Sequence, residues 1–249
     1  MLLTLLIACT PKPAAGFRAQ LTARLEQLAA HPRIEVMAAY FAPPLDAAGL
    51  ARVEAHYGRP LDAPLRALFS ETGGVQVLWR CVPARAPGPL PDPSKRYDEG
   101  ADLLNRDGID GFIEIDPIAW LPEDKTARRE IDGEAIPWSQ LRLFDAGSYY
   151  YAAALVVDPR FPEPRVVEMD DYYAHVEERS MSTQAYLDRL IATVGYHGEH
   201  HDSLCAGALE DVGLAPPHAR TGPGTGAWSN EGPLPAPDRA RTDRPRTPP

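Results

Sequence analysis

The chain has 249 residues, 44 % of them apolar, and a formal net charge of −10. This length fits one domain with appendages, and the apolar fraction is large enough to bury a core, which excludes a chain that is disordered throughout. Nucleic acid is not the expected partner, because contacts to phosphates need clusters of lysine and arginine. The acidic charge is compatible with a basic protein partner, and the alternative is that it only keeps the protein soluble.

Residues 1–16 are predicted to be a flexible or signal-like N-terminus. The stretch Leu6-Ile7-Ala8-Cys9 is similar to the lipobox of bacterial lipoproteins, in which Cys9 would carry the lipid. No lysine or arginine precedes this apolar run, so a plain apolar start is the alternative. The run is also shorter than the roughly 20 residues that cross a bilayer. We expect a cytoplasmic protein, with lipid anchoring in the bacterial envelope as the alternative.

Three helices are predicted in the first third of the chain, within 16–32, 42–58 and 59–74. The first has leucines at helical spacing and stops at Pro32. Asp46 and Gly58 suit the N-cap and C′ positions of the second helix, and Asp62 suits the N-cap of the third.

Strands are predicted in the middle of the chain, at 75–79, 111–115, 141–147, 149–158 and 164–170. A Pro-rich insertion lies around 83–108, and the polar stretch 123–140 is expected to be exposed surface. A last helix lies within 180–196, capped by Ser182 or Thr183. Helices first, strands next and a helix last favour an α+β fold with one central, mostly antiparallel sheet packed by helices.

Residues 215–249 are rich in proline, glycine, arginine and threonine, which predicts a disordered tail. Their five arginines and three acidic residues give them a net charge of +2, so the rest of the chain carries −12. The folded part, expected at 17–200, is therefore more acidic than the total indicates.

The Gly73-Gly74 pair invites the interpretation of a phosphate-binding loop. Such loops run strand, glycines, helix, so that helix N–H groups face the anion. Here a predicted helix comes first and a strand follows, which favours a helix C-cap and a turn that needs positive φ.

No catalytic, cofactor or metal site is predicted, and the chain is expected not to be an enzyme. It has no G-x-S-x-G, no H-E-x-x-H and no cysteine with a matched histidine signature. His197, His200, His201 and Cys205 are metal-capable, but without a second ligand cluster a solvated stretch is the simpler interpretation. The three cysteines are far apart and odd in number, so reduced thiols are expected.

Acidic and aromatic residues gather in the stretch 168–178. Glu168, Asp170 and Asp171 stand beside Tyr172 and Tyr173. Carboxylates beside amphipathic rings suit an interface with a basic protein, so these five are the predicted partner-binding residues. The alternative is that one tyrosine is core and the acids are solvated.

The stretch 48–74 resembles the signature of the SUKH superfamily (Smi–Knr-like domain), which includes fungal cell-wall regulators and bacterial immunity proteins. The matching residues are Glu54, Gly58, Leu61, Leu65, Phe69, Gly73 and Gly74. Asp62 stands where the family often has proline, and Thr72 where it often has asparagine. The similarity covers roughly residues 40–195 and implies an α+β fold.

The resemblance also implies a function. It predicts a non-enzymatic protein-binding module, an immunity protein that neutralises a cognate toxin of the nuclease or deaminase type. The acidic charge predicts that this toxin is basic. A regulatory or scaffold protein of the Smi–Knr type and an envelope lipoprotein are the alternatives.

Overall fold

The computed structural model describes residues 15–97, 109–119, 121, 128–146, 151–170, 175–176, 179–196 and 203–214. Within these ranges the helices are α1 (Phe17–Ala29), α2 (Ala47–Tyr57), α3 (Ala63–Glu71), α4 (Thr183–Thr193) and α5 (Ser203–Asp211), with a 3-10 turn η2 (Trp138–Gln140). The strands are β1 (Ile34–Phe41), β2 (Val75–Cys81), β3 (Gly111–Ile115), β4 (Arg128–Ile131), β5 (Glu134–Pro137), β6 (Leu141–Asp145), β7 (Tyr151–Val156), β8 (Arg165–Asp170), β9 (His175–Val176) and β10 (Met181–Ser182).

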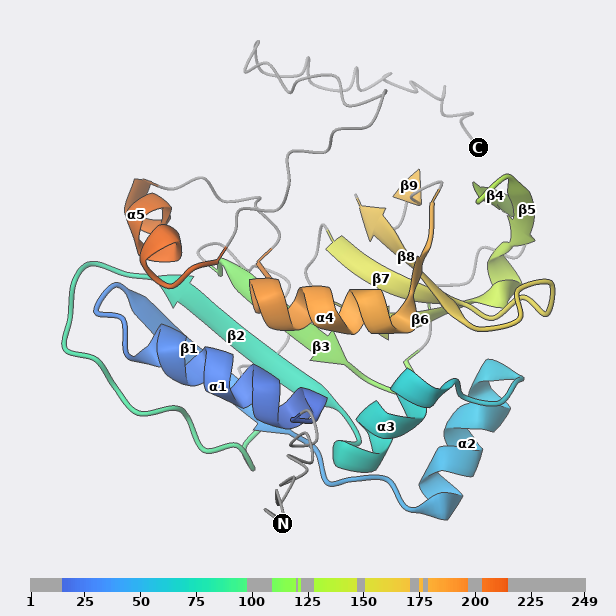
Figure 1. Cartoon of the computed structure of the whole chain (residues 1–249), viewed down its shortest axis with the longest axis horizontal. Helices are drawn as coiled ribbons and strands as arrows, with labels where there is room; N and C mark the ends of the chain where they lie inside the picture. The colour runs from blue at the N-terminus through green and yellow to red at the C-terminus, as the bar shows by residue number, and fades with distance from the viewer. Residues whose placement is uncertain are drawn as a thin grey trace, which may run out of the picture. The chain divides into compact units, whose positions relative to one another are not determined.

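The strands form one central antiparallel sheet, which confirms the expected α+β class (Figure 1). Its order is β1-β2-β3-β6-β7-β8-β10, and β9 pairs with β8. β4 and β5 form a separate hairpin. The prediction of strands in the middle of the chain holds, but the sheet begins earlier, with β1, a segment for which the sequence pattern predicted no element.

Side chains alternate between the two faces of the sheet because a strand has a period of two residues. Ala153 and Leu155 of β7 belong to the core on the helix side. Ala152, Ala154 and Val156 belong to the core on the other side. Both faces are covered, which explains why β7 is apolar at consecutive positions.

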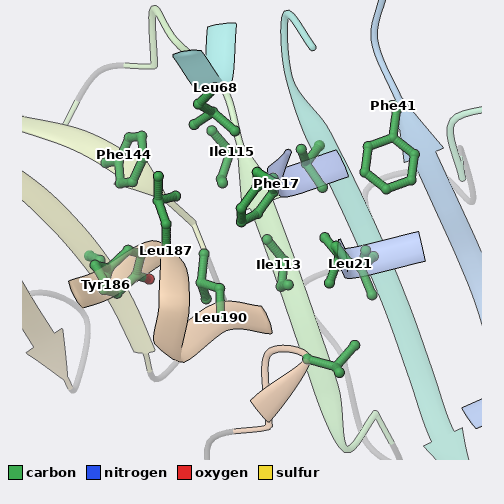
Figure 2. Packing of buried hydrophobic residues seen from close by; sticks show 14 of the residues in the cluster. Phe17, Leu21, Phe41, Leu68, Ile113, Ile115, Phe144, Tyr186, Leu187 and Leu190 are labelled. Atoms are coloured by element: carbon green, nitrogen blue, oxygen red, sulfur yellow. The ribbon is translucent and has the colours of Figure 1, made fainter. Parts of the chain in front are cut away.

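Helices α1, α3 and α4 cover one face of the sheet (Figure 1). Leu21 and Leu25 of α1 recur at helical spacing and are fully buried. Figure 2 shows Leu21 from α1 and Leu187 and Leu190 from α4 among the buried side chains around Ile113 and Ile115 of β3. The helical layer is therefore held by one continuous apolar core.

The opposite face is covered by the β4–β5 hairpin and by part of the Pro-rich segment. Ile131 and Ile136 of the hairpin are fully buried against the strands. The expectation that 123–140 is exposed surface is therefore wrong for this hairpin: its polar residues point outward while alternate positions are core. Residues 83–97 contain no helix or strand, and Pro93 accepts a hydrogen bond from the Phe41 backbone N–H at the outer edge of β1.

The predicted helix caps are confirmed. The carboxylate of Asp46 accepts a hydrogen bond from the Gly49 N–H, and Gly58 ends α2 in the left-handed conformation, with φ of 70°. Ser182 caps α4 by accepting from the Ala185 N–H. These local bonds satisfy backbone groups that a helix end leaves open, so they fix where each helix starts and stops.

Candidate functional site

Glu168, a predicted partner-binding residue, lies on the helix-facing side of β8. Its carboxylate pairs with the guanidinium of Arg189 in α4, and the Glu168 side chain is only 13 % exposed. Arg189 also lies over the ring of Tyr186, 5.3 Å from its centroid. The structure therefore uses the Glu168 carboxylate to join the sheet to a helix rather than presenting it at the surface.

The other residues predicted for partner binding lie at or beyond the end of β8. Asp170 closes this strand, opposite Tyr151 of β7 and His175 of β9. Asp171, Tyr172 and Tyr173 lie outside the described residues, as does Cys9, the predicted lipidation site. The structure does not bring this group together into one described surface.

The Gly73-Gly74 turn links α3 to β2 and is held by Thr72. The buried Thr72 hydroxyl donates to the Ala42 carbonyl at 3.0 Å and lies 2.6 Å from the Gly74 carbonyl. A Cβ atom at Gly73 would come within 2.6 Å of the Pro43 carbonyl oxygen. The helix does stop here, but the prediction that this turn needs positive φ is wrong: α3 ends at Glu71, Thr72 is extended, and neither Gly73 nor Gly74 has positive φ. The glycine at position 73 serves the close approach of backbones instead.

Beside this turn lies a small hollow, on the sheet face away from the helices. Its volume is about 110 Å³, and it is lined by Tyr40, Ala42, Gly73, Gly74, Val75, Gln76, Arg96, Ile115, Asp116 and Pro117. Arg96 at this site forms an ion pair with Glu114. Drug-sized ligands need pockets of roughly 300 Å³ or more, so this hollow has room only for a small chemical group.

Gln76 is the most unusual residue in the lining because it is a polar residue inside a sheet. Its side chain is 1 % exposed. Its Oε1 accepts a hydrogen bond from the Tyr97 N–H at 2.8 Å, whereas its enclosed Nε2 makes no hydrogen bond to any residue that the structure describes. A buried donor left unsatisfied costs about 1–3 kcal/mol, so its presence calls for an explanation.

Asp116 supplies a carboxylate to the same hollow. Its Oδ1 accepts from the Ile118 N–H at 3.0 Å, which fixes the turn that follows β3. Ile118 itself is 53 % exposed, an uncommon position for a large apolar side chain. Ile118 does not line the hollow, whose lining combines Gln76, Asp116 and Arg96 with apolar residues such as Val75, Ile115 and Pro117.

Two buried tyrosines lie near carboxylates elsewhere in the fold. The Tyr186 hydroxyl donates to the fully buried Asp145 at 2.9 Å, and burial, together with that carboxylate, raises the pKa of Tyr186 well above its ordinary value. Burial also raises the pKa of Tyr57 and lowers the pKa of its neighbour His56. Both phenols stay protonated near neutrality, and the Tyr186–Asp145 bond ties α4 to β6 as part of the core.

Cys81 corrects one prediction directly. It is disulfide-bonded, whereas reduced thiols were expected from the spacing and the odd count. Three cysteines can still form one disulfide and leave a single free thiol. The fold can bring two cysteines together even when they are far apart in the sequence. The side chains of Cys9 and Cys205 lie outside the described part of the chain.

Sequence reasoning missed Gln76, Arg96 and Asp145. A glutamine flanked by valines in "VQVLW" is a detectable signal, because a polar residue inside an apolar strand needs a hydrogen-bond partner. The pairing of Arg96 with Glu114 had no such signal. Among the described residues, no three histidine, cysteine or acidic side chains cluster as a metal site would require.

Comparison with known proteins places this chain in no group: no family model, no curated protein and no solved structure matches it. Over the described ranges, none of the helices has the length and apolar character needed to cross a membrane.

Proposed function

We propose that this chain is a non-enzymatic protein-binding module, an immunity protein that captures and neutralises a basic toxin of the nuclease or deaminase type. The observation that carries the proposal is the charge: the chain has a net −10, and residues 1–214 carry −12. An acidic surface steers a basic partner and raises its association rate. The resemblance to immunity proteins supplies the type of partner.

Charged side chains of both signs lie on the part of the surface that the structure describes. Several guanidinium groups bind backbone carbonyls of the chain itself, as Arg24, Arg59 and Arg142 do. Exposed carboxylates occur on many elements: Glu26, Asp46, Asp92, Glu130, Asp132, Glu134, Glu163, Asp188, Glu210 and Asp211. Exposed cations are interspersed with them: Arg52, Arg66, Arg80, Arg85, Lys95, Arg96, Arg160 and Arg179. The steering argument therefore rests on the net charge of the chain rather than on one acidic face of the described residues.

The direct test is to co-express the chain with the protein encoded by the adjacent gene, because a toxin and its antidote are expected to be inherited together. The expected result is a stable complex and loss of the neighbour's toxicity. The control is an unrelated acidic protein of similar size, which should not protect. If the neighbour is neither bound nor neutralised, the immunity proposal is lost.

A second candidate, an envelope lipoprotein anchored through Cys9, gains support from the disulfide at Cys81. Disulfides persist in oxidising compartments and are rare in the cytosol. Mass spectrometry of the N-terminal peptide tests this candidate. A lipidated Cys9 would still allow an immunity function, directed against a toxin that acts in the envelope, whereas an unmodified N-terminus would eliminate anchoring.

A further inference from the structure

Helix α5 is the last element of the described fold, and it lies outside the layer formed by α1, α3 and α4 (Figure 1). It adds no strand to the sheet and packs against β2. Ala208 and Leu209 of α5, with Leu214 just after it, are buried in the core that the helices share with the sheet. All strands of the described sheet precede α5 in the chain, so release of α5 would remove no strand pairing.

The polar contacts from the first helix to α5 are long. Arg24 of α1 donates to the Val212 and Gly213 carbonyls at 3.4 and 3.5 Å. The His31 ring, which follows α1, lies 3.4 Å from the Asp211 carboxylate. Good hydrogen bonds from nitrogen to oxygen measure about 2.7–3.2 Å, so these contacts hold α5 weakly. A helix of nine residues is also marginal in water when it is not packed against a fold.

The disulfide at Cys81 supplies a stronger attachment. Cys81 is the last residue of β2 and is partly exposed. The other cysteines of the chain are Cys9 and Cys205. Because Cys205 lies on α5 and α5 packs against β2, the fold favours the pairing of Cys81 with Cys205. This bond would keep α5 on the sheet even though its polar contacts are weak.

A disulfide of this kind can be opened by a dithiol reductant. The thiolate of the reductant attacks one sulfur, the protein S–S bond breaks, and a mixed disulfide forms while the other protein sulfur leaves as a thiolate. The second thiol of the reductant then displaces the first protein sulfur, so the protein keeps two thiols and the reductant leaves as its own disulfide. Dithiol reductants are abundant in the cytosol, whereas disulfides persist in oxidising compartments.

We propose that the disulfide between Cys81 and Cys205 is a redox-controlled latch on α5. When the latch is oxidised, α5 stays on β2. When the latch is reduced, α5 leaves the sheet, while the sheet and the other helices stay folded, and apolar surface that includes Leu209 and Leu214 is uncovered. The latch goes beyond the proposed capture of a toxin and does not depend on it, because it acts within the chain.

Hydrogen exchange followed by mass spectrometry tests the latch on the full chain. The chain is oxidised with oxidised glutathione and then measured with and without dithiothreitol. We expect reduction to speed exchange of the amides of residues 207–214 by about tenfold or more, because α5 can then open locally. The amides of α4 should change by less than about twofold. The fluorescence of 8-anilinonaphthalene-1-sulfonate should rise on reduction, because this dye binds exposed apolar surface.

Three matched variants locate the effect. Cys81→Ser and Cys205→Ser should both exchange at the reduced rate, with or without dithiothreitol. Cys9→Ser removes the cysteine outside the latch and should respond to dithiothreitol as the unchanged chain does. If Cys81→Ser does not fold, Cys205→Ser and the reduced chain give the same comparison.

Several results would overturn the proposal. One is failure of the disulfide to form in oxidised glutathione, and another is an unchanged exchange rate for α5 on reduction. Faster exchange in α1 and α4 as well would show that the bond holds the whole fold together. A redox response that is lost in Cys9→Ser but kept in Cys205→Ser would assign the bond to Cys9. None of these results bears on toxin capture, which is measured with a partner present.

Discussion

At the scale of single residues, the fold depends on close contacts between backbones and on hydrogen bonds between buried polar groups that are far apart in the sequence. Gly73 packs against the Pro43 carbonyl, and Asp145 accepts a hydrogen bond from the Tyr186 hydroxyl. That a helix stops near Gly73 could be predicted, but the left-handed glycine cap expected there is absent, since α3 ends at Glu71 and Thr72 is extended. The hydrogen bond between Asp145 and Tyr186 could not be predicted, because no sequence pattern near either residue indicates the other as its partner.

Gly73→Ala should lower the free energy of unfolding by about 1–3 kcal/mol, because the new methyl group would lie 2.6 Å from a backbone oxygen. Gly88→Ala is the matched control, since a Cβ there meets nothing within 4 Å. It should change stability by less than about 0.5 kcal/mol. Urea unfolding of the three proteins measures both values, and equal losses would contradict the packing argument.

Asp158 should contribute stability that disappears in acid. Its hydrogen bonds with the Arg160 side chain hold the pKa of the Asp158 carboxyl below its ordinary value. A lowered folded-state pKa stabilises the fold above the unfolded pKa, near 4, and this contribution is lost as the pH falls through the folded value. Asp158→Asn should therefore lower the free energy of unfolding at pH 7, and the difference from the unchanged protein should shrink as the pH falls through the folded-state pKa of Asp158.

The same substitution at exposed Asp188 controls for the loss of one negative charge. Urea unfolding at several pH values gives the comparison. If the free energy of unfolding of Asp158→Asn differed from that of the unchanged protein by the same amount at every pH, the ion pair would be ruled out as the cause of the difference.

At the scale of elements, α3 and α4 are joined at their N-termini by one carboxylate. Asp62 caps α3 by accepting from the Leu65 N–H at 3.0 Å, and its second oxygen accepts from the hydroxyl of buried Thr183 in α4. The resembled family often has proline at this position, which could supply neither bond. Here the residue is both a helix cap and a link between two helices.

Asp62→Ala should therefore cost more than the loss of a cap. Asp46→Ala is the control, because Asp46 caps α2 through Gly49 in the same way and, within the described ranges, makes no second hydrogen bond to another helix. We expect about 1 kcal/mol for Asp46→Ala and about 2 kcal/mol or more for Asp62→Ala. Equal losses in thermal or urea unfolding would show that the Thr183 bond adds nothing.

Helix α5 should be covalently attached to the sheet. Cys81 ends β2 and is disulfide-bonded, and α5, on which Cys205 lies, packs against β2. We expect peptide mapping without reductant to recover the Cys81 peptide linked to the Cys205 peptide. A link to Cys9 instead would contradict this prediction and would also remove Cys9 as a lipidation site, so one measurement bears on both.

The sequence predicted the elements with strong local signals and missed those without them. Helices α2 and α3 have capping aspartates and clear apolar faces, and both were predicted. β1 is a short, mostly apolar run in which periodicity cannot separate a strand from a buried helix. The β4–β5 hairpin was hidden in a stretch whose polar residues dominate, because only alternate positions are buried. Helix α5 has only nine residues and follows a histidine-rich stretch that was interpreted as solvated.

At the scale of the whole molecule, the net charge can be counted directly from the sequence, whereas the positions of the charged groups come from the structure. The net −10 follows from counting, while the structure shows which carboxylates remain exposed and which, like Glu168, are paired inside. The burial of Glu168 could not be predicted from the sequence, because its pairing with Arg189 depends on how α4 crosses the sheet.

Association with a basic partner should slow as salt is added, by tenfold or more between about 0.01 and 0.5 M, because screening shortens the reach of the acidic field. A chain ending at residue 214 loses a segment of net +2 and should associate at least as fast. Stopped-flow mixing measures both rates. A salt-independent rate would exclude steering, and loss of binding on truncation would favour a scaffold role through residues 215–249.

The bond from the Phe41 N–H to the Pro93 carbonyl closes part of the outer edge of β1. An open edge strand offers its backbone groups to any other extended chain, and natural sheets block such edges with prolines and irregular cover. The Pro-rich segment therefore hinders pairing between the β1 edges of two copies of the chain. A variant with a shorter segment should still fold, but its copies should associate through their β1 edges. Its aggregation should therefore increase with protein concentration.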